Sequence, residues 1–335
     1  MRFSLAAMGR TSGVRRQRDI SAAADRGVYT SVAELASLEA AARDFSFLRR
    51  QPVHSLLSGR HGSHVRGRGL AFEELRQYLP GDDIRTMDWR VTARTGKPYI
   101  RVFSEEKDRP AIIVVDQRIN MFFGSVRSTK SVAAAEVAAL GAWRVLGQGD
   151  RVGGFVFNDT HIDELRPHRS RAAVMRFAET LTTRNRELRA DTTESRAPGQ
   201  LNAVLDAAAD IATHDHLVLL ISDFDGHDAR TRDLLLRLAG ANEVVAVLVY
   251  DPFLLKLPPS GEIVVSDGEL QVELGLAHGA MRQNLANFAD ARAREILGWR
   301  RELGVTVMPI SAAEEVAPQV RRLLGQAAWQ RPGRR

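Results

Sequence analysis

Cysteine is absent from this chain of 335 residues. Disulfide bonds, thiolate metal ligands and cysteine nucleophiles are therefore excluded, and the absence fits a reducing compartment, so we expect a cytoplasmic protein. The sequence also has no apolar run of about 18 residues, the length that a transmembrane helix needs, so we expect no membrane insertion. Lysine is scarce: only four of the 47 basic residues are lysines, and the rest are arginines.

Signature motifs of several enzyme classes are missing as well. No G-x-G-x-x-G motif or Walker lysine follows a predicted strand, and no serine lies in a G-x-S-x-G turn. Asp116, which ends a predicted strand, does not begin the D-x-D pair of a phosphoaspartyl phosphatase. These absences exclude dinucleotide-dependent enzymes, P-loop kinases and hydrolases that use such a serine.

The net charge of +6 comes from three stretches that are rich in arginine, residues 1–30, 49–68 and 321–335, while the rest of the chain is acidic. A protein that binds nucleic acid needs a basic stripe on its folded surface, so nucleic acid is not an expected partner. Residues 1–30 lack apolar periodicity, so we expect a disordered tail there, and a second basic tail over residues 326–335.

The chain is organised around Ala111–Asp116, an apolar run that ends in an aspartate. A strand loses its polar/apolar alternation when both of its faces are buried, as in a parallel sheet. Similar runs end next to Asp223 and Asp251, and segments with helical periodicity separate them. This alternation predicts an α/β fold with a doubly wound, mostly parallel sheet, in which ligands gather at the carboxyl ends of the strands.

The sequence also predicts where the individual elements lie. We expect helices over residues 129–146, 170–184, 201–213, 229–239, 279–303 and 313–324. We expect further strands over residues 151–158, 216–222, 243–250 and 305–310. Gly153-Gly154 would allow a helix to approach closely, and Asp267-Gly268 predicts a tight hairpin between residues 262–266 and 269–273.

The N-terminal part predicts an extension to this fold. Ser31 and Glu34 match a capping box, so we expect a helix from there to about Arg49 that packs on the body. Residues 50–70 resemble a solvated loop, and their three histidines (His54, His61 and His64) lack the further ligands that a zinc site needs. Pro80-Gly81 predicts a turn, and residues 89–93 and 99–103 predict a β-hairpin.

Acids and arginines alternate in the segment after residue 70. Asp82, Asp83 and Asp88 are able to bind Mg²⁺ in a metal-dependent hydrolase or nuclease, or to pair with arginines that fix an irregular subdomain. We favour the pairing and keep the hydrolase as the alternative. The residues expected to build this structural motif are Arg76, Tyr78, Gly81, Asp82, Asp83, Arg85, Asp88, Trp89 and Arg94.

Residues 73–106, with the core PGDDIRTMDW, together with Asp116 and NMFFG at 120–124, resemble the bacterial family catalogued as domain of unknown function 58. The resemblance covers roughly residues 30–325. It implies a von Willebrand factor A-like domain over residues 110–325, preceded by a helix-and-hairpin subdomain over residues 31–109. It also implies a non-enzymatic adaptor or assembly factor, whose partners are a MoxR-class AAA+ ATPase and other von Willebrand factor A proteins.

The same resemblance implies a Mg²⁺ site of oxygen ligands, which in this sequence is degenerate. Asp116, Asn120 and Asp223 occupy ligand positions, but Arg118 and Gln200 stand where a serine and a threonine are expected. We therefore expect no cofactor. Two positions for Arg118 stay open: its guanidinium takes the place of the metal, or it points to solvent. The residues expected to contact a partner are Arg118, Gln200 and Asp225.

Overall fold

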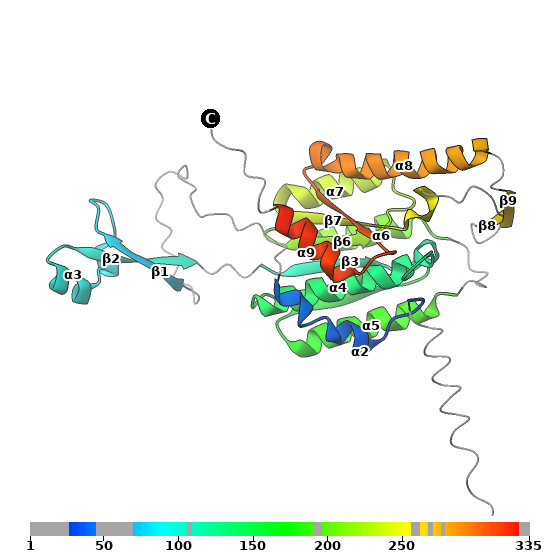
Figure 1. Ribbon diagram of the computed structural model, residues 1–335. Helices are drawn as coiled ribbons and strands as arrows, with labels where there is room; N and C mark the ends of the chain where they lie inside the picture. Colours follow the sequence, from blue (N-terminus) through cyan, green and yellow to red (C-terminus); the bar gives the residue numbers. More distant parts are fainter. Residues whose placement is uncertain are drawn as a thin grey trace, which may run out of the picture. The chain divides into compact units, whose positions relative to one another are not determined.

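The computed structural model describes residues 27–44, 70–105, 109–189, 196–255, 262–266, 271–275 and 279–327. The chain divides into two compact units (Figure 1). We call Arg50–Asp108 the hairpin unit, and Met1–Arg49 together with Arg109–Arg335 the body. Across the described residues, every helix is too short or too polar to cross a lipid bilayer.

A six-stranded sheet forms the centre of the body, with the strand order β10-β7-β6-β3-β4-β5. Neighbouring strands are parallel except β4 and β5, which are antiparallel. The strands are β3 (Ala111–Asp116), β4 (Val152–Phe157), β5 (Ile162–His168), β6 (Leu217–Ser222), β7 (Glu243–Tyr250) and β10 (Thr306–Ser311). A separate hairpin is formed by β8 (Glu262–Ser266) and β9 (Gln271–Gly275).

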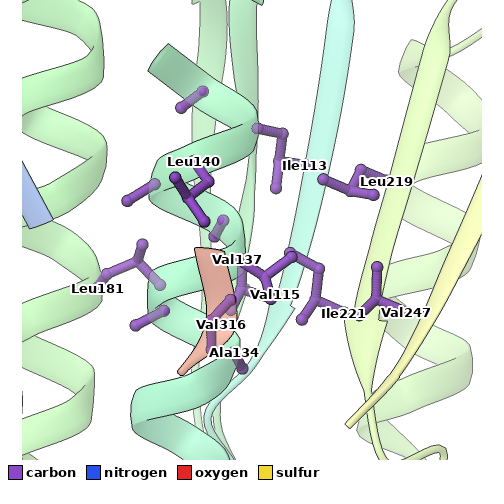
Figure 2. Close-up of a cluster of buried hydrophobic side chains, with 14 of the residues drawn as sticks. Ile113, Val115, Ala134, Val137, Leu140, Leu181, Leu219, Ile221, Val247 and Val316 are labelled. Atoms are coloured by element: carbon purple, nitrogen blue, oxygen red, sulfur yellow. The ribbon is translucent and has the colours of Figure 1, made fainter. Parts of the chain in front are cut away.

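Helices cover both faces of this sheet. The body helices are α2 (Val32–Ser37), α4 (Lys130–Gly147), α5 (Arg171–Glu187), α6 (Gln200–Ile211), α7 (Ala229–Ala241), α8 (Gly279–Glu302) and α9 (Val316–Ala327). Ile113 and Val115 pack with α4, α5 and α9 on one face (Figure 2). Ile112 and Val114 pack with α6, α7 and α8 on the other face. Both faces of β3 are buried, which explains why its sequence has no polar alternation. The mixed α/β fold with a mostly parallel sheet is confirmed.

The strand order places a reversal between β3 and β6. After β3 the chain crosses to β4 through α4 on one face, and after β6 it crosses to β7 through α7 on the other face. The loops that follow β3 and β6 therefore diverge, and in α/β sheets such a switch point is where ligands bind. Asp116 and Asp223 lie at this point, at the carboxyl ends of adjacent strands.

The predicted helices and strands of the body are confirmed to within about three residues at each end. The antiparallel edge strand β5 was not predicted, because its sequence IDELRPH is charged and contains a proline, which is typical of edge strands. The predicted role of Gly153-Gly154 is wrong. A Cβ atom on Gly154 would lie 1.9 Å from the Ile113 oxygen and one on Gly153 would lie 2.4 Å from the Leu165 oxygen, so neighbouring strands need the space.

Two further boundaries are corrected. Ser266 pairs with Gln271, so four residues separate β8 from β9, whereas the predicted turn had two. As a result, β9 begins at residue 271, two residues after the predicted start. The capping box of Ser31 and Glu34 is confirmed, but α2 ends at Ser37 and a 3-10 helix, η1, follows over Ala41–Asp44. The Leu35 carbonyl accepts a bond from Trp143 Nε1 at 3.0 Å, and this tertiary bond replaces one that a longer helix would make.

Residues 27–44 pack on the part of the body that follows residue 108. Within the predicted disordered tail, the Tyr29 hydroxyl donates to the Leu188 oxygen at 2.8 Å and the Thr30 amide donates to Asn185 Oδ1 at 2.9 Å. The tail prediction is therefore wrong for residues 27–30. Residues 1–26, the histidine loop and residues 328–335 lie outside the described residues.

The hairpin unit pairs β1 (Leu70–Gln77) with β2 (Tyr99–Glu105) in an antiparallel ladder. The connection between them contains a 3-10 helix, η2 (Ile84–Thr86), and α3 (Trp89–Thr95). The prediction of a strand over residues 89–93 is wrong. Asp88 accepts bonds from the amides of Arg90 and Val91, and Gly96 ends the helix with a φ of 70°, so these two caps override the β-prone residues between them.

Candidate functional site

The first part of the site is a buried ion pair between Asp116 and Arg118. Arg118 Nη2 lies 2.7 Å from Asp116 Oδ2, and Arg118 Nε lies 3.0 Å from Asp116 Oδ1. The Asp116 side chain is 0% exposed and the Arg118 side chain is 1% exposed. Burial alone would lower the pKa of the guanidinium, but the adjacent Asp116 carboxylate, with the charges of Asp223 and Asp225, raises that pKa above its usual range. Arg118 is therefore charged and points inward.

The second part of the site surrounds Asp223. Lys130 Nζ lies 2.5 Å from Asp223 Oδ2, and Asn120 Nδ2 donates to Asp223 Oδ1 at 2.7 Å. Arg292 of α8 donates to the Asp223 carbonyl oxygen at 2.7 Å. Burial alone would raise the pKa of Asp223, but the charges of Lys130 and Arg292 hold it well below its ordinary value.

A short hydrogen-bond chain joins the two parts. The Ser222 hydroxyl donates to Asp116 Oδ2 at 2.6 Å and accepts from the Phe224 amide at 2.8 Å. Phe224 has a φ of 55°, which a side chain with a Cβ rarely adopts. Its buried ring packs edge-on against Trp299 of α8 with the centroids 5.1 Å apart. The loop after β6 is thus held in its strained conformation by the core and by Asp116.

Asp225 forms the outer part of the site. Arg292 Nη1 donates to Asp225 Oδ1 at 2.9 Å, and Arg196 Nη2 lies 3.3 Å from Asp225 Oδ2. The backbone of Asp225 also reaches inward, since its carbonyl oxygen accepts from Arg118 Nη2 at 3.1 Å. The complete ionic cluster consists of Asp116, Asp223, Asp225, Arg118, Lys130, Arg196 and Arg292.

The cluster does not fit a divalent metal ion. Of the three predicted ligands, Asp116 and Asp223 are brought together by adjacent strands, and Asn120 lies beside Asp223. However, both oxygens of each carboxylate already accept bonds from the chain's own donors. The described residues contain no group of three His, Cys, Asp or Glu side chains able to hold a metal. A divalent cation would here meet Arg118 and Lys130, which repel it.

Gln200, a predicted partner contact, and Asp251, the third strand-end aspartate, lie outside this cluster. Gln200 Nε2 lies 3.4 Å from the Asp159 carbonyl oxygen instead of approaching the carboxylates. Asp251 accepts bonds from the Ser125 amide at 2.9 Å and the Ser125 hydroxyl at 2.6 Å, so it anchors the loop after β3. Of the predicted partner contacts, Asp225 and Gln200 are half-buried, but the Arg118 side chain is closed to solvent.

Comparison with known proteins identifies the family. The family model described as "Protein of unknown function DUF58" matches residues 74–295. The chain belongs to this family. Relatives of the DUF58 chain include uncharacterized proteins of Mycobacterium bovis and Mycobacterium tuberculosis, each 30% identical over 281 residues, covering 82% of this chain and 84% of the relative.

Among solved structures, the chain is similar to the crystal structure of the conserved hypothetical protein BatB from Bacteroides thetaiotaomicron. It is 12% identical, covers 66% of this chain and 100% of that chain, and gives a TM-score of 0.38. A score this low carries no argument about fold or function. The function of the DUF58 chain must therefore be argued from its own residues.

The three aspartates predicted as alternative metal ligands, Asp82, Asp83 and Asp88, make structural contacts instead. Asp82 accepts two bonds from Arg76, at 2.7 and 2.9 Å, which lower its pKa together with the bond from the Leu79 amide. Asp83 caps η2. Asp88 caps α3 and pairs with Arg101 Nε at 2.8 Å, and these bonds lower its pKa. The predicted pairing is seen at Asp82 and Asp88, although Arg101 was not among the expected partners. No observation favours the hydrolase alternative, which stays an untested prediction.

Sequence reasoning missed Lys130, Arg196 and Arg292 as members of the cluster, and it missed Ser222, which donates to Asp116. Lys130 begins α4 and was visible only as one of four lysines. Arg292 lies in the middle of α8, among several other arginines, and no motif marks it. Of the other members, Asp116 and Asp223 were predicted from their positions at strand ends, and Arg118 and Asp225 were among the expected partner contacts.

Proposed function

We propose that this DUF58 chain is a non-enzymatic protein-interaction domain of the von Willebrand factor A type. In this proposal it acts in the cytoplasm as an adaptor or assembly factor for a MoxR-class AAA+ ATPase, and other von Willebrand factor A proteins are further partners. The observation that carries the proposal is the ionic cluster, because its carboxylates are neutralised by cations of the same chain. A site of this kind has neither a free base nor a free metal ligand, and it suits binding better than catalysis.

Apolar side chains at the same edge of the sheet support a binding role. Phe123 and Val126, in the loop after β3, are 42% and 77% exposed. Phe253, in the 3-10 helix η4 (Pro252–Leu255) that follows β7, lies beside Phe123 with ring centroids 6.1 Å apart. Exposed apolar residues close to a rigid polar cluster are typical of a protein-binding surface. We call Phe123, Val126 and Phe253 the edge patch.

An affinity purification from the native host tests the proposal. Full-length chain is the bait, in buffer with ATP analogue, with ADP and without nucleotide. We expect to recover a MoxR-class ATPase in at least one condition, and Phe123→Ser/Val126→Ser to lose it. Leu236→Ser is the matched control, because Leu236 is 47% exposed on α7, away from the edge patch, and should leave recovery unchanged. Recovery of no ATPase in any condition contradicts the proposal.

A metal titration tests the role of Arg118. If Arg118 replaces a metal ion, millimolar Mg²⁺ or Mn²⁺ will not raise the melting temperature of the wild type. Arg118→Ser removes the guanidinium and leaves Asp116 without its main cation, so we expect metal to raise the melting temperature of this variant. Arg196→Ser, which removes an outer cation, is the control and should show no metal effect. A clear metal-induced stabilisation of the wild type would overturn this interpretation.

A further inference from the structure

The connection between β1 and β2, residues 78–98, exposes large apolar side chains. We call this connection the hairpin cap. Leu79, Ile84 and Trp89 are 60%, 63% and 69% exposed, and together they supply three of the eight exposed large apolar side chains in the described part of the chain. Scattered exposed apolar residues are normal in proteins, but three in one short connection are unusual and indicate a contact surface.

The hairpin cap is held in place by its own hydrogen bonds. At its start, the Tyr78 amide donates to the Pro98 oxygen at 2.9 Å, and Asp82 binds Arg76 through both oxygens. At its centre, the Asp88 amide donates to the Tyr99 oxygen at 2.8 Å. Because the backbone is already ordered, binding a partner through these side chains costs little conformational entropy.

Basic side chains accompany the apolar ones. Arg85, Arg90, Arg94 and Lys97 are exposed, and none of them forms an ion pair with a described residue. Arg90 and Arg94 are one helical turn apart, so they lie on the same side of α3. The nearby acids Asp82 and Asp88 are occupied by Arg76 and Arg101. Asp83 is exposed and caps η2, so one carboxylate stands against these four exposed cations and the surface charge is positive.

We propose that the hairpin cap docks an acidic, amphipathic segment of a partner protein. The apolar side of that segment covers Leu79, Ile84 and Trp89, and its carboxylates pair with the free arginines. Tryptophan and arginine are the residue types that contribute most binding energy at protein interfaces. This surface belongs to the hairpin unit and shares no residue with the edge patch, so the inference goes beyond the proposed function.

The combination of positive charge and exposed apolar side chains favours an acidic, amphipathic protein segment over a second copy of the chain and over nucleic acid. In a symmetric contact between two copies of the chain, the arginines of one cap would face those of the other and repel them. Nucleic acid would satisfy the arginines but would leave Leu79 and Ile84 uncovered, and Trp89 is the only aromatic side chain among the three exposed apolar ones.

Fluorescence anisotropy with the full-length chain tests this inference. The probe is a labelled helical peptide with leucines on one face and glutamates on the other. Its controls are the same peptide with glutamine for glutamate, and a single-stranded DNA of equal charge. We expect the acidic peptide to bind at least tenfold more tightly than either control, and high salt to weaken its binding.

Variants locate the contact. Trp89→Ser and Arg90→Glu/Arg94→Glu should each weaken peptide binding at least tenfold, because they remove the main apolar contact and reverse the charge. Phe123→Ser and Leu236→Ser should leave peptide binding unchanged. A failure of this inference is therefore distinguishable from a failure of the proposed function, which depends on the edge patch. Hydrogen exchange in β1 and β2 checks that each variant keeps the hairpin.

Three results would overturn the inference. The first is peptide binding that is absent or insensitive to Trp89→Ser. The second is tighter binding of DNA than of the peptide. The third is a wild-type dimer that Trp89→Ser dissociates, which would assign the hairpin cap to contact between copies.

Discussion

The two units of this chain use charge in opposite ways. In the body, the carboxyl edge of the sheet buries Asp116 with Arg118, and the cations around Asp223 come from two different helices. In the hairpin unit, acids are used to hold the backbone of the cap, while Arg85, Arg90 and Arg94 remain exposed beside apolar side chains. In the body the charges are paired within the chain, whereas in the hairpin unit the arginines are available to a partner.

This difference separates stability from recognition. A buried ion pair contributes little net stability, because desolvation offsets the attraction, but losing one partner leaves an expensive buried charge. An exposed arginine contributes little to folding but remains available to a partner. We therefore expect substitutions in the buried ionic cluster to affect folding, and substitutions in the exposed hairpin cap to affect binding.

Arg118→Met should have the largest effect of the single substitutions at the ionic cluster. It leaves the Asp116 carboxylate buried without its cation, and we expect the free energy of unfolding to fall by about 3–5 kcal/mol. Denaturation with urea, followed by circular dichroism, measures the change. Asp116→Asn/Arg118→Met removes both charges and should recover at least half of the loss. A double variant as unstable as the single one would show that the pair is not the cause.

Asp223→Asn should have a smaller effect that depends on pH. The folded-state pKa of Asp223 lies below the ordinary value of about 3.9, so its charge stabilises the fold above that pH, and this contribution is lost as the pH falls. We expect the variant to be less stable than the wild type by about 1–3 kcal/mol at pH 7. The difference should shrink below about pH 4. A difference that stays constant from pH 7 to pH 3 would contradict the ionic interpretation.

The sheet and its switch point were predictable because they depend on local patterns. Ala111–Asp116 shows its double-sided burial directly in its composition, and the same holds for the strands before Asp223 and Asp251. Of the ionic cluster, the aspartates and Arg118 were predicted from the sequence, but Lys130, Arg196 and Arg292 were not. Lys130 and Arg292 reach Asp223 across 93 and 69 positions of sequence, and no local pattern encodes such a contact.

The hairpin unit shows a different limit. Residues 89–93 (WRVTA) are β-prone, yet they begin α3, because Asp88 supplies the amino-terminal cap and Gly96 the carboxyl-terminal one. The two cap residues could be recognised in the sequence. The prediction was wrong about the strand that pairs with β2, because it chose residues 89–93, which follow the PGDD turn. β1 lies before that turn, and only its pairing with β2 leaves residues 89–95 free to form a helix.

Asp88→Ala should act within the hairpin unit and leave the body intact. The substitution removes the bonds to the amides of Arg90 and Val91 and the pair with Arg101. We expect amide exchange in α3 to become roughly tenfold faster, as is usual when a helix cap is lost. Exchange in α4 should stay unchanged, and Arg94→Ala is the control for an exposed position in the same helix. Equal acceleration in both units would mean that they unfold together.

Trp89→Ser should have the smallest effect on stability, and it compares the same residue type in the two units. Trp89 is 69% exposed in the hairpin unit, whereas Trp299 is fully buried in the body against Phe224. We expect Trp89→Ser to change the free energy of unfolding by at most about 0.5 kcal/mol, and Trp299→Ala to lower it by about 3–5 kcal/mol. Urea denaturation measures both. A loss of more than about 1 kcal/mol for Trp89→Ser would show that this side chain is covered by the chain itself in solution. Its exposure would then no longer mark a surface kept open for a partner.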